Sequence, residues 1–330
     1  MLTYIARRLV LAAITVFAIT LVTFAILHLP PVDFVSAYAA QAAASGSAIS
    51  AAEADAMRLA YGLNQPLYVQ YWKWIAMVAS GNFGRSFEYG RPVTEVIGDR
   101  LWLTVALSLG AIVVTWGLAL PIGIYSAVRQ YSIGDYIFTF LGFVGLAIPN
   151  FLLALIVMYF GLTLLGISVS GLFSADQQLA PWSWTKLIDL LQHLPVPILI
   201  LSLAGTAQLV RIMRANLLDE LRRPYVVTAR ARGLQERRVI LKYPVRAAMN
   251  PFASTIGYLL PQLVSGSIII SVVLSLPTVG PLLLRSLLSQ DMLLASTIIL
   301  LLGILTVVGT LLSDLLLMWI DPRIRLGQMR

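Results

Sequence analysis

Leu9–Leu29 reads LVLAAITVFAITLVTFAILHL, an apolar stretch of 21 residues that directly follows Arg7 and Arg8. A helix rises about 1.5 Å per residue, so this stretch is long enough to cross the roughly 30 Å of hydrocarbon in a bilayer. The apolar region of a cleaved signal peptide runs only about 7–15 residues, so we expect Leu9–Leu29 to be retained as an anchor. Five further apolar stretches of comparable length follow, at residues 101–128, 137–165, 195–215, 252–276 and 293–320. The pattern predicts an all-α polytopic membrane protein with six transmembrane helices.

The amino-acid composition excludes several other protein classes. Of the 330 residues, 59% are hydrophobic and 12% are charged, whereas about 25% of the residues of soluble globular domains are charged. The chain has no cysteine, so it can form no disulfide, thiolate nucleophile or zinc–thiolate site. A soluble domain, a disordered chain and a disulfide-stabilised secreted scaffold are therefore excluded.

The distribution of basic residues predicts the orientation in the membrane. If the N-terminus lies in the cytoplasm, the cytoplasmic segments hold 16 of the 23 Lys and Arg residues and the outer segments hold 7. Ten of the 16 lie between Arg211 and Arg246, in one loop. Because cytoplasmic loops carry the excess of positive charge, both termini are predicted to be cytoplasmic. The net charge of +8 then reflects topology, and no nucleic-acid partner is expected.

The spans divide the chain into three predicted parts. Residues 1–29 form the N-terminal anchor and first span, and residues 30–100 form a periplasmic or extracellular loop with short helices. Residues 101–330 form a core of five spans with a cytoplasmic loop at 216–250. In the outer loop, the Ala/Ser-rich stretch 36–52 is expected to be weakly specified. A helix should begin at the capping box of Ser50 and Glu53 and end at Gly62, and a second helix should begin at Pro66.

The cytoplasmic loop has an unusual pattern of helix breakers. The fourth span should continue into the cytoplasm until Pro224, and a short helix should run from Val226 to Arg232 and stop at Gly233. A further helix is expected from Gln235 to Ala248. The small residues Ala229, Ala231 and Gly233 permit close approach of another backbone. Two interpretations remain open at this point: a docking site for another protein, or an amphipathic, arginine-rich loop that faces lipid.

The chain carries no recognisable catalytic machinery. It has no G-x-x-x-x-G-K-[ST] nucleotide motif, no H-E-x-x-H zinc motif and no G-x-S-x-G nucleophile motif. Asp314 is the only carboxylate well inside a predicted span, about two turns from its cytoplasmic end. A proton relay would need several such groups, so we expect Asp314 to be structural, paired with the arginine-rich loop. No metal site and no cofactor bound by this chain are expected.

Several short motifs occur in a characteristic order along nearly the whole chain. They are Tyr4-Ile-Ala-Arg-Arg-Leu, Tyr61-Gly-Leu-Asn-Gln-Pro, Gly81-Asn-Phe-Gly-Arg-Ser, Tyr225-Val-Val-Thr-Ala-Arg-Ala-Arg-Gly-Leu, Ser275-Leu-Pro-Thr-Val-Gly and Asp321-Pro-Arg-Ile-Arg. In this order and spacing the sequence resembles permease subunits of the oligopeptide/dipeptide/nickel family of binding-protein-dependent ABC importers. The resemblance implies the type I ABC importer permease fold.

The resemblance also implies a role for the cytoplasmic motif. It would be the coupling helix of the EAA loop, which docks in a groove of a cytoplasmic ATPase. Ala229 and Gly233 match the general EAA pattern, whereas Val227 stands where that pattern has Glu. The residues expected to serve ATPase coupling are Tyr225, Val226, Thr228, Ala229, Arg230, Ala231, Arg232, Gly233 and Leu234.

Polar residues on the fifth span are candidates for the substrate pathway. They are Gln262, Ser265, Ser267 and Ser271, and the alternative is that such small residues only allow close helix packing. Relatives often carry a Glu at the position of Ser271, and many have Gly at the position of Thr278. The missing carboxylate leaves the solute open among peptides, opines, sugars and other small molecules.

The resemblance implies one subunit of a larger machine. This chain would form half of a translocation pathway in a bacterial inner membrane, surrounded by lipid and beside a second, homologous permease. Two ABC ATPases would bind ATP and Mg²⁺, and a periplasmic or lipid-anchored solute-binding protein would deliver the solute, so the chain itself would be no enzyme. The alternative is a stand-alone secondary transporter or channel, which the lack of evident inverted repeats and of further intramembrane carboxylates disfavours.

Overall fold

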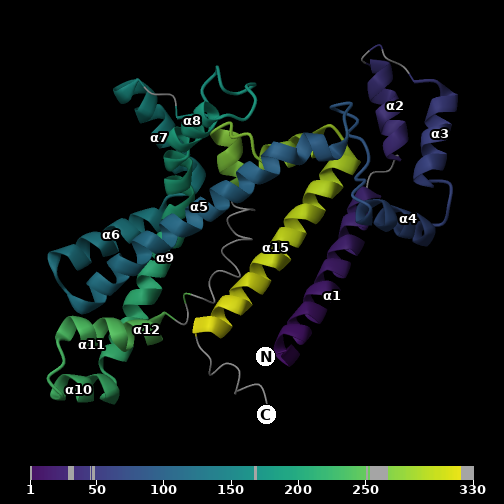
Figure 1. Ribbon diagram of the computed structural model, residues 1–330. Helices are drawn as coiled ribbons and strands as arrows, with labels where there is room; N and C mark the ends of the chain where they lie inside the picture. Colours follow the sequence, from purple (N-terminus) through teal and green to yellow (C-terminus); the bar gives the residue numbers. More distant parts are fainter. Residues whose placement is uncertain are drawn as a thin grey trace. The chain divides into compact units, whose positions relative to one another are not determined.

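The computed structural model describes residues 2–28, 33–44, 46, 49–166, 169–249, 252 and 267–320, and these residues are predominantly helical (Figure 1). No β-strand is found in these ranges apart from a single antiparallel bridge between Arg85 and Pro92. The all-α prediction is therefore confirmed. The helices are α1 (Leu2–Leu27), α2 (Phe34–Ala44), α3 (Ala51–Tyr61), α4 (Leu67–Ala79), α5 (Val93–Val128), α6 (Ile133–Ala147), α7 (Asn150–Leu165), α8 (Trp184–His193), α9 (Pro195–Leu221), α10 (Pro224–Ala231), α11 (Glu236–Lys242), α12 (Pro244–Ala248), α14 (Val279–Leu288) and α15 (Met292–Ile320).

Within the described ranges, four helices are long and apolar enough to cross a membrane: α1, α5, α9 and α15. They coincide with four of the six predicted spans. The fifth predicted span, 252–276, falls largely outside the described residues. Of this span the structure describes only Phe252 and residues 267–276, of which 267–273 are helical. The count of six spans and the cytoplasmic placement of both ends stay predictions.

The predicted third span, 137–165, is two helices instead of one. Helices α6 and α7 form a pair bent by 103°. The break lies at Ile148, whose backbone is extended with φ −86° and ψ 121°, and at the Pro149 that follows it. Proline disfavours the helical conformation in the residue before it and lacks an N–H group, so the helix ends there and a new one begins.

The chain divides into two compact units. The first comprises Thr104–Pro277 with the two chain ends, and the second comprises Ile5–Leu103 with Thr278–Val307. In the first unit α9 lies beside α5 with very close contacts, because a Cβ atom placed on Gly110 would lie 2.5 Å from Ile198 and one on Gly123 would lie 2.6 Å from Met213. Small residues thus allow the two long helices to pack closely, as is common in membranes.

In the second unit the outer helices follow the local sequence signals. The Glu53 N–H donates to Ser50 Oγ at 3.2 Å and the Ser50 N–H donates to Glu53 Oε2 at 2.8 Å, so the predicted capping box is confirmed. Gly62 ends α3 in the left-handed conformation at φ +71°, and α4 begins directly after Pro66, also as predicted.

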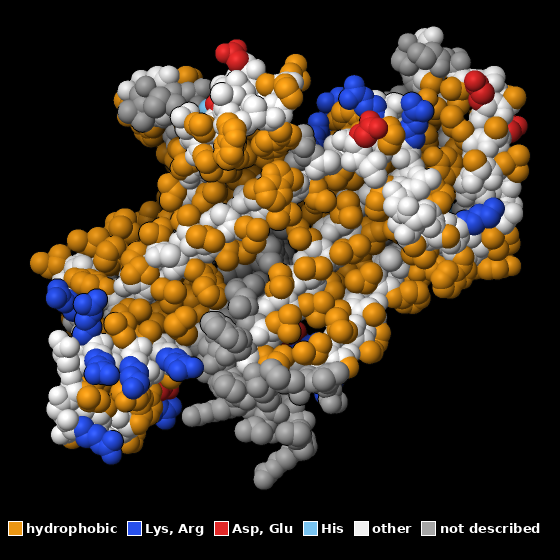
Figure 2. Space-filling model, in the orientation of Figure 1, with side chains coloured by type: hydrophobic (Ala, Val, Ile, Leu, Met, Phe, Trp, Pro, Cys, Tyr) orange, Lys and Arg blue, Asp and Glu red, His pale blue; other side chains and the backbone are white. Residues whose placement is uncertain are grey.

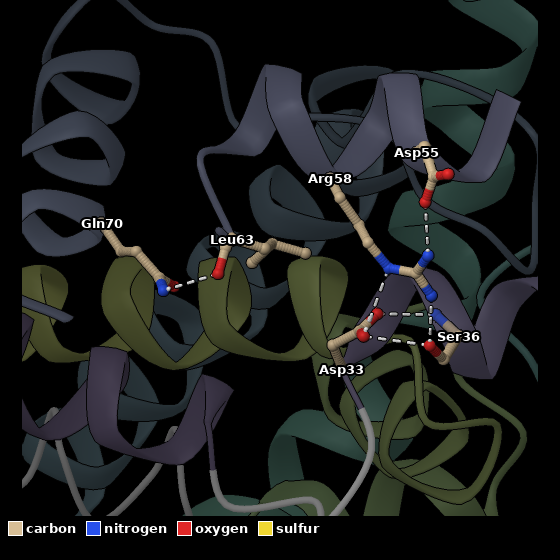
Figure 3. Close-up of polar contacts among 6 residues, drawn as sticks. All are labelled: Asp33, Ser36, Asp55, Arg58, Leu63 and Gln70. Carbon is tan, nitrogen blue, oxygen red and sulfur yellow. Dashed lines mark hydrogen bonds and ion pairs between the residues drawn. The ribbon is translucent and has the colours of Figure 1, made fainter. Parts of the chain in front are cut away.

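The Ala/Ser-rich stretch is more ordered than its composition suggested, because its first part forms α2. Asp33 accepts a hydrogen bond from the Ser36 N–H at 2.7 Å at the start of this helix. From α3, Arg58 donates to Ser36 Oγ at 2.7 Å and lies 3.5 Å from Asp33 and 2.9 Å from Asp55 (Figure 3). Alanine has the best helix propensity, and these tertiary bonds hold the resulting helix against α3.

Helix α4 is joined to the end of α1 by polar and aromatic contacts. The Gln70 side-chain amide donates to the Leu63 carbonyl at 3.1 Å (Figure 3), and its oxygen lies 2.9 Å from His28 Nε2. Tyr71 is buried against Phe24 with ring centroids 5.3 Å apart, whereas Trp72 on the same helix is exposed. The aromatic residues of α4 are therefore divided between the contact with α1 and the exposed surface of the helix.

Asp291 binds one of the motifs that carried the family resemblance, Gly81–Ser86. Its buried carboxylate accepts bonds from Ser86 Oγ at 2.5 Å, from the Glu88 N–H at 3.2 Å and from the Leu294 N–H at 3.2 Å. Glu88 also pairs with Arg285 on α14. The Gly81–Ser86 turn is thereby held against the start of α15.

Candidate functional site

The loop after α9, predicted to be cytoplasmic, folds as a hairpin of two short helices (Figure 1). Helix α9 continues to Leu221 and α10 ends before Gly233, in agreement with the predicted breaks at Pro224 and Gly233. Helices α10 and α11 pack against each other, which was not predicted. The single helix expected over 235–248 is instead α11 and α12. Its break lies at Tyr243-Pro244, since a proline cannot continue the hydrogen-bond ladder of α11.

The inner face of α10 forms a small hydrophobic core with α11. Val226 and Ala229 on α10 and Val239 on α11 are buried there, and Leu234 and Tyr243 pack around them. Two of the residues expected to serve coupling, Val226 and Ala229, therefore stabilise the hairpin and present no surface to a partner. Their spacing of three residues is the helical spacing of one buried face.

The outer face of α10 is open. Tyr225 is 41% exposed and Val227 is 56% exposed, and Thr228, Ala231 and Arg232 are also exposed. Val227 was absent from the residues predicted for coupling, because it departs from the acidic residue of the EAA pattern. The helical spacing could have predicted its exposure, because Val227 lies on the opposite side of the helix from the buried Val226 and Ala229.

An ion pair closes the turn between α10 and α11. Gly233 takes the left-handed conformation at φ +73°, and its N–H donates to the Arg230 carbonyl at 2.9 Å. The Arg230 guanidinium lies 2.7 Å from the Glu236 carboxylate across this turn. Hydrogen bonds from Arg230 lower the pKa of Glu236, and the same bonds raise the pKa of Arg230. Glycine is favoured at Gly233 because other residues rarely adopt this backbone conformation.

Tyr225 ties the start of α10 back to α9. Its hydroxyl donates a hydrogen bond to the Glu220 carboxylate. Burial, together with the bond to Glu220 and the charge of Glu220, raises the pKa of Tyr225 to about 12. The phenol therefore stays protonated at physiological pH and remains a donor to Glu220.

A bidentate ion pair that the sequence analysis did not predict joins Arg214, nearly two turns before Glu220 on α9, to Asp135 on α6. Arg214 Nε donates to Asp135 Oδ1 and Arg214 Nη2 donates to Asp135 Oδ2, both at 2.9 Å. Asp135 is 2% exposed and also accepts from the Tyr131 N–H at 3.0 Å, and its own N–H donates to Ser132 Oγ at 3.2 Å. The pair joins the first turn of α6 to the C-terminal part of α9. A Ser132 cap before α6 was the signal that could have drawn attention to Asp135.

Two of the four predicted pathway residues lie within the described part of the chain. Gln262 and Ser265 lie outside the described residues. Ser267 and Ser271 share one face of the helical residues 267–273, and both are buried. The Ser271 hydroxyl has no hydrogen-bond partner in the described part of the chain. Asp314 is also buried, on α15, and its pairing with the arginine-rich loop stays a prediction.

The described residues offer no site for a metal ion, since no three His, Asp or Glu side chains among them are grouped suitably. The arrangement instead links the short helix α10 to the longer helices α9 and α6. A short helix with an open outer face is held by Tyr225 to α9, and α9 is held by Arg214 to α6. Such an arrangement is suited to transmit displacement of α10 to membrane helices.

Comparisons with known proteins identify the family. Residues 119–326 match the model of the binding-protein-dependent transport system inner membrane component, and residues 1–108 match the N-terminal model of such membrane components. The oligopeptide transport system permease protein AppB of Bacillus subtilis is 34% identical over 98% of this chain and 99% of its own length. The dipeptide transport system permease protein DppB of Lactococcus lactis is 30% identical over 99% of this chain and 100% of its own length. The protein of the same name from Escherichia coli is 32% identical over 98% of this chain and 99% of its own length.

The chain therefore belongs to the permease family of binding-protein-dependent ABC importers and has its type I permease fold. It is a multi-pass membrane protein and a membrane subunit of such an importer. The family resemblance drawn from the motifs is confirmed.

Proposed function

We propose that this chain forms one half of the solute pathway of an ATP-driven importer, and that a cytoplasmic ATPase grips the outer face of α10. The observation that carries the proposal is the division of α10 into two faces. Val226 and Ala229 hold the helix to α11, which leaves Tyr225, Val227 and Thr228 on the open side. A folded helix with an exposed apolar residue is suited to insertion in a groove of a partner.

The proposed coupling path runs from α10 through α9 to α6. When ATP draws the two ATPases together, α10 moves with the ATPase that holds it. The Tyr225–Glu220 bond passes this movement to α9, and the Asp135–Arg214 pair passes it to α6. The spans then rock largely as rigid bodies, which is a common form of conformational switching.

The proposed assembly contains four further kinds of component. A second permease completes the pathway, two ATPases bind ATP and Mg²⁺, and a solute-binding protein delivers the cargo, while this chain binds no cofactor. The family description, an inner membrane component of a binding-protein-dependent system, supports this assembly and a location in the bacterial inner membrane. Annular lipid completes the surroundings, and no nucleic acid takes part.

The proposed cargo is a peptide or a related small solute. The support is the naming of relatives as oligopeptide and dipeptide permeases. Gln262, Ser265, Ser267 and Ser271 are proposed to lie along the pathway, and the unpartnered hydroxyl of Ser271 supports a polar contact there. A stand-alone transporter or channel is the alternative function, and transport without ATP would favour it.

Because the chain has no cysteine, a single introduced cysteine can test the docking face directly. We expect Thr228→Cys, on the outer face of α10 and labelled with a maleimide–benzophenone reagent, to crosslink to the ATPase when the whole complex is irradiated. Leu241→Cys is the matched control, since Leu241 is exposed on α11 and should crosslink poorly. Crosslinking of the control alone would refute the docking face. Purification of this chain through a tag, alone and without a second permease or ATPase, would refute the assembly.

A further inference from the structure

Helix α11 is the middle layer between α10 and the membrane helices of its unit. Its buried residues point in two directions. Val239 packs into the small core shared with α10, whereas Ile240 packs into the larger core formed with Leu209, Met213 and Leu217 of α9. Helix α9 continues from here as an apolar helix long enough to span a membrane, so α11 is expected near the headgroup region.

The remaining face of α11 is open and strongly basic. Arg237, Arg238 and Lys242 are exposed there, and Leu241 between them is 50% exposed. The one acid of this helix, Glu236, is paired with Arg230. No carboxylate in the described part of the chain pairs with the three basic residues, and Lys242 contacts only the ring of Tyr243, at 5.5 Å. An exposed leucine flanked by basic residues is typical of helices that lie in a membrane interface.

The surface around α11 has the same character. Figure 2 shows Lys and Arg side chains gathered over the α10–α11 end of the unit, next to the predominantly hydrophobic surface of the longer helices. Each Lys or Arg near the surface of an anionic leaflet is attracted to that leaflet.

We propose that the exposed face of α11, formed by Arg237, Arg238, Leu241 and Lys242, binds anionic phospholipid headgroups of the cytoplasmic leaflet. The three cations contact phosphate oxygens, and Leu241 reaches the upper part of the acyl region. The occupant is lipid and not the ATPase, because α11 packs between α10, which carries the proposed docking face, and the core of α9. The proposal depends on the predicted cytoplasmic side of the loop and is independent of ATPase docking.

Native mass spectrometry of the full chain can test this surface. The chain is purified in mild detergent, exchanged into micelles doped with equal amounts of phosphatidylglycerol and phosphatidylcholine, and the retained lipids are counted. We expect wild type to retain more phosphatidylglycerol than phosphatidylcholine. In the triple variant R237Q/R238Q/K242Q, the ratio of the two retained lipids should fall about fivefold for each basic residue removed. High salt should weaken the wild-type preference in the same direction.

Two further variants keep the outcome interpretable. R222Q/R223Q/R232Q removes the same charge from the α10 side of the hairpin and should retain most of the preference. R237K/R238K/K242R conserves the charge and should behave as wild type even if the glutamine variant folds poorly. Equal loss in the two glutamine variants, or full preference in R237Q/R238Q/K242Q, would overturn the proposal. Loss of ATPase binding with unchanged lipid preference would also overturn it, in favour of a protein-docking surface.

Discussion

Removing Arg214 should destabilise the chain far more than removing a neighbouring arginine of the same helix. Arg214 supplies two hydrogen bonds of 2.9 Å to a carboxylate that is 2% exposed. Arg214→Met would leave Asp135 with the Tyr131 N–H as its main remaining donor. An uncompensated buried charge costs about 3–5 kcal/mol, and the partial exposure of Arg214 places the expected loss near 3 kcal/mol.

The complementary variant should be milder. Asp135→Asn keeps an acceptor for Arg214 and removes the buried charge, so we expect a loss of about 1.5–3 kcal/mol, the range for a hydrogen bond to a charged group. The apolar pair Asp135→Leu with Arg214→Met should regain much of the stability, because no charge is then left buried.

The assay is unfolding of the purified chain in mild detergent, followed by tryptophan fluorescence, with the yield of monodisperse protein as a second readout. Arg211→Met is the matched control, since Arg211 lies one turn before Arg214 and is exposed. Equal destabilisation by Arg211→Met and Arg214→Met would refute the reasoning, as would additive losses in the double variant. In the whole importer, Asp135→Asn should lower the solute transported per ATP hydrolysed. An unchanged ratio would remove the pair from the coupling path.

Three further predictions concern the hairpin and the sixth span. Gly233→Val should uncouple transport from ATP hydrolysis while membrane insertion stays normal, because a β-branched residue is strained at φ +73°. Gly233→Asn should retain coupling, since asparagine tolerates this conformation. Wild-type uptake by the valine variant would contradict the docking role. Asp314→Asn should lower the yield of folded complex more than it changes substrate choice, and a normal yield with altered proton dependence would instead indicate a proton-handling residue. Arg230 lowers the pKa of Glu236, so the ion pair contributes its full stability to the hairpin at pH values above the ordinary carboxyl pKa of 4.5. This contribution is lost as the pH falls and Glu236 becomes protonated. Limited proteolysis across pH 3–6 should show the loss in wild type and not in Glu236→Gln.

A permease with a lipid-binding α11 and an ATPase-binding α10 would respond to both partners through one hairpin. The two faces are separated by the core of Val226, Ala229 and Val239, so the two surfaces can be altered independently. Comparing lipid retention with ATP-driven transport in the same set of variants would measure how far the leaflet composition influences coupling.

The sequence by itself determined where most helices begin and end, because those signals are local. An apolar run of span length, the capping box of Ser50 and Glu53, and the left-handed glycines Gly62 and Gly233 each act within a few residues. The same is true of the family, since short motifs in a distinctive order identify it without knowledge of the contacts. The third span shows where such reasoning ends: Pro149 is visible in the sequence, but the 103° bend is not.

Only the tertiary structure decided which residues of the coupling motif face outward and which charges are paired. The direction of each α10 side chain depends on α11 packing against it, and this buries Val226 and Ala229 and exposes Val227. The partner of Arg214 lies 79 residues earlier in the chain, at Asp135. No local pattern specifies such a pair, because its free energy arises only when two distant segments exclude water from the same carboxylate.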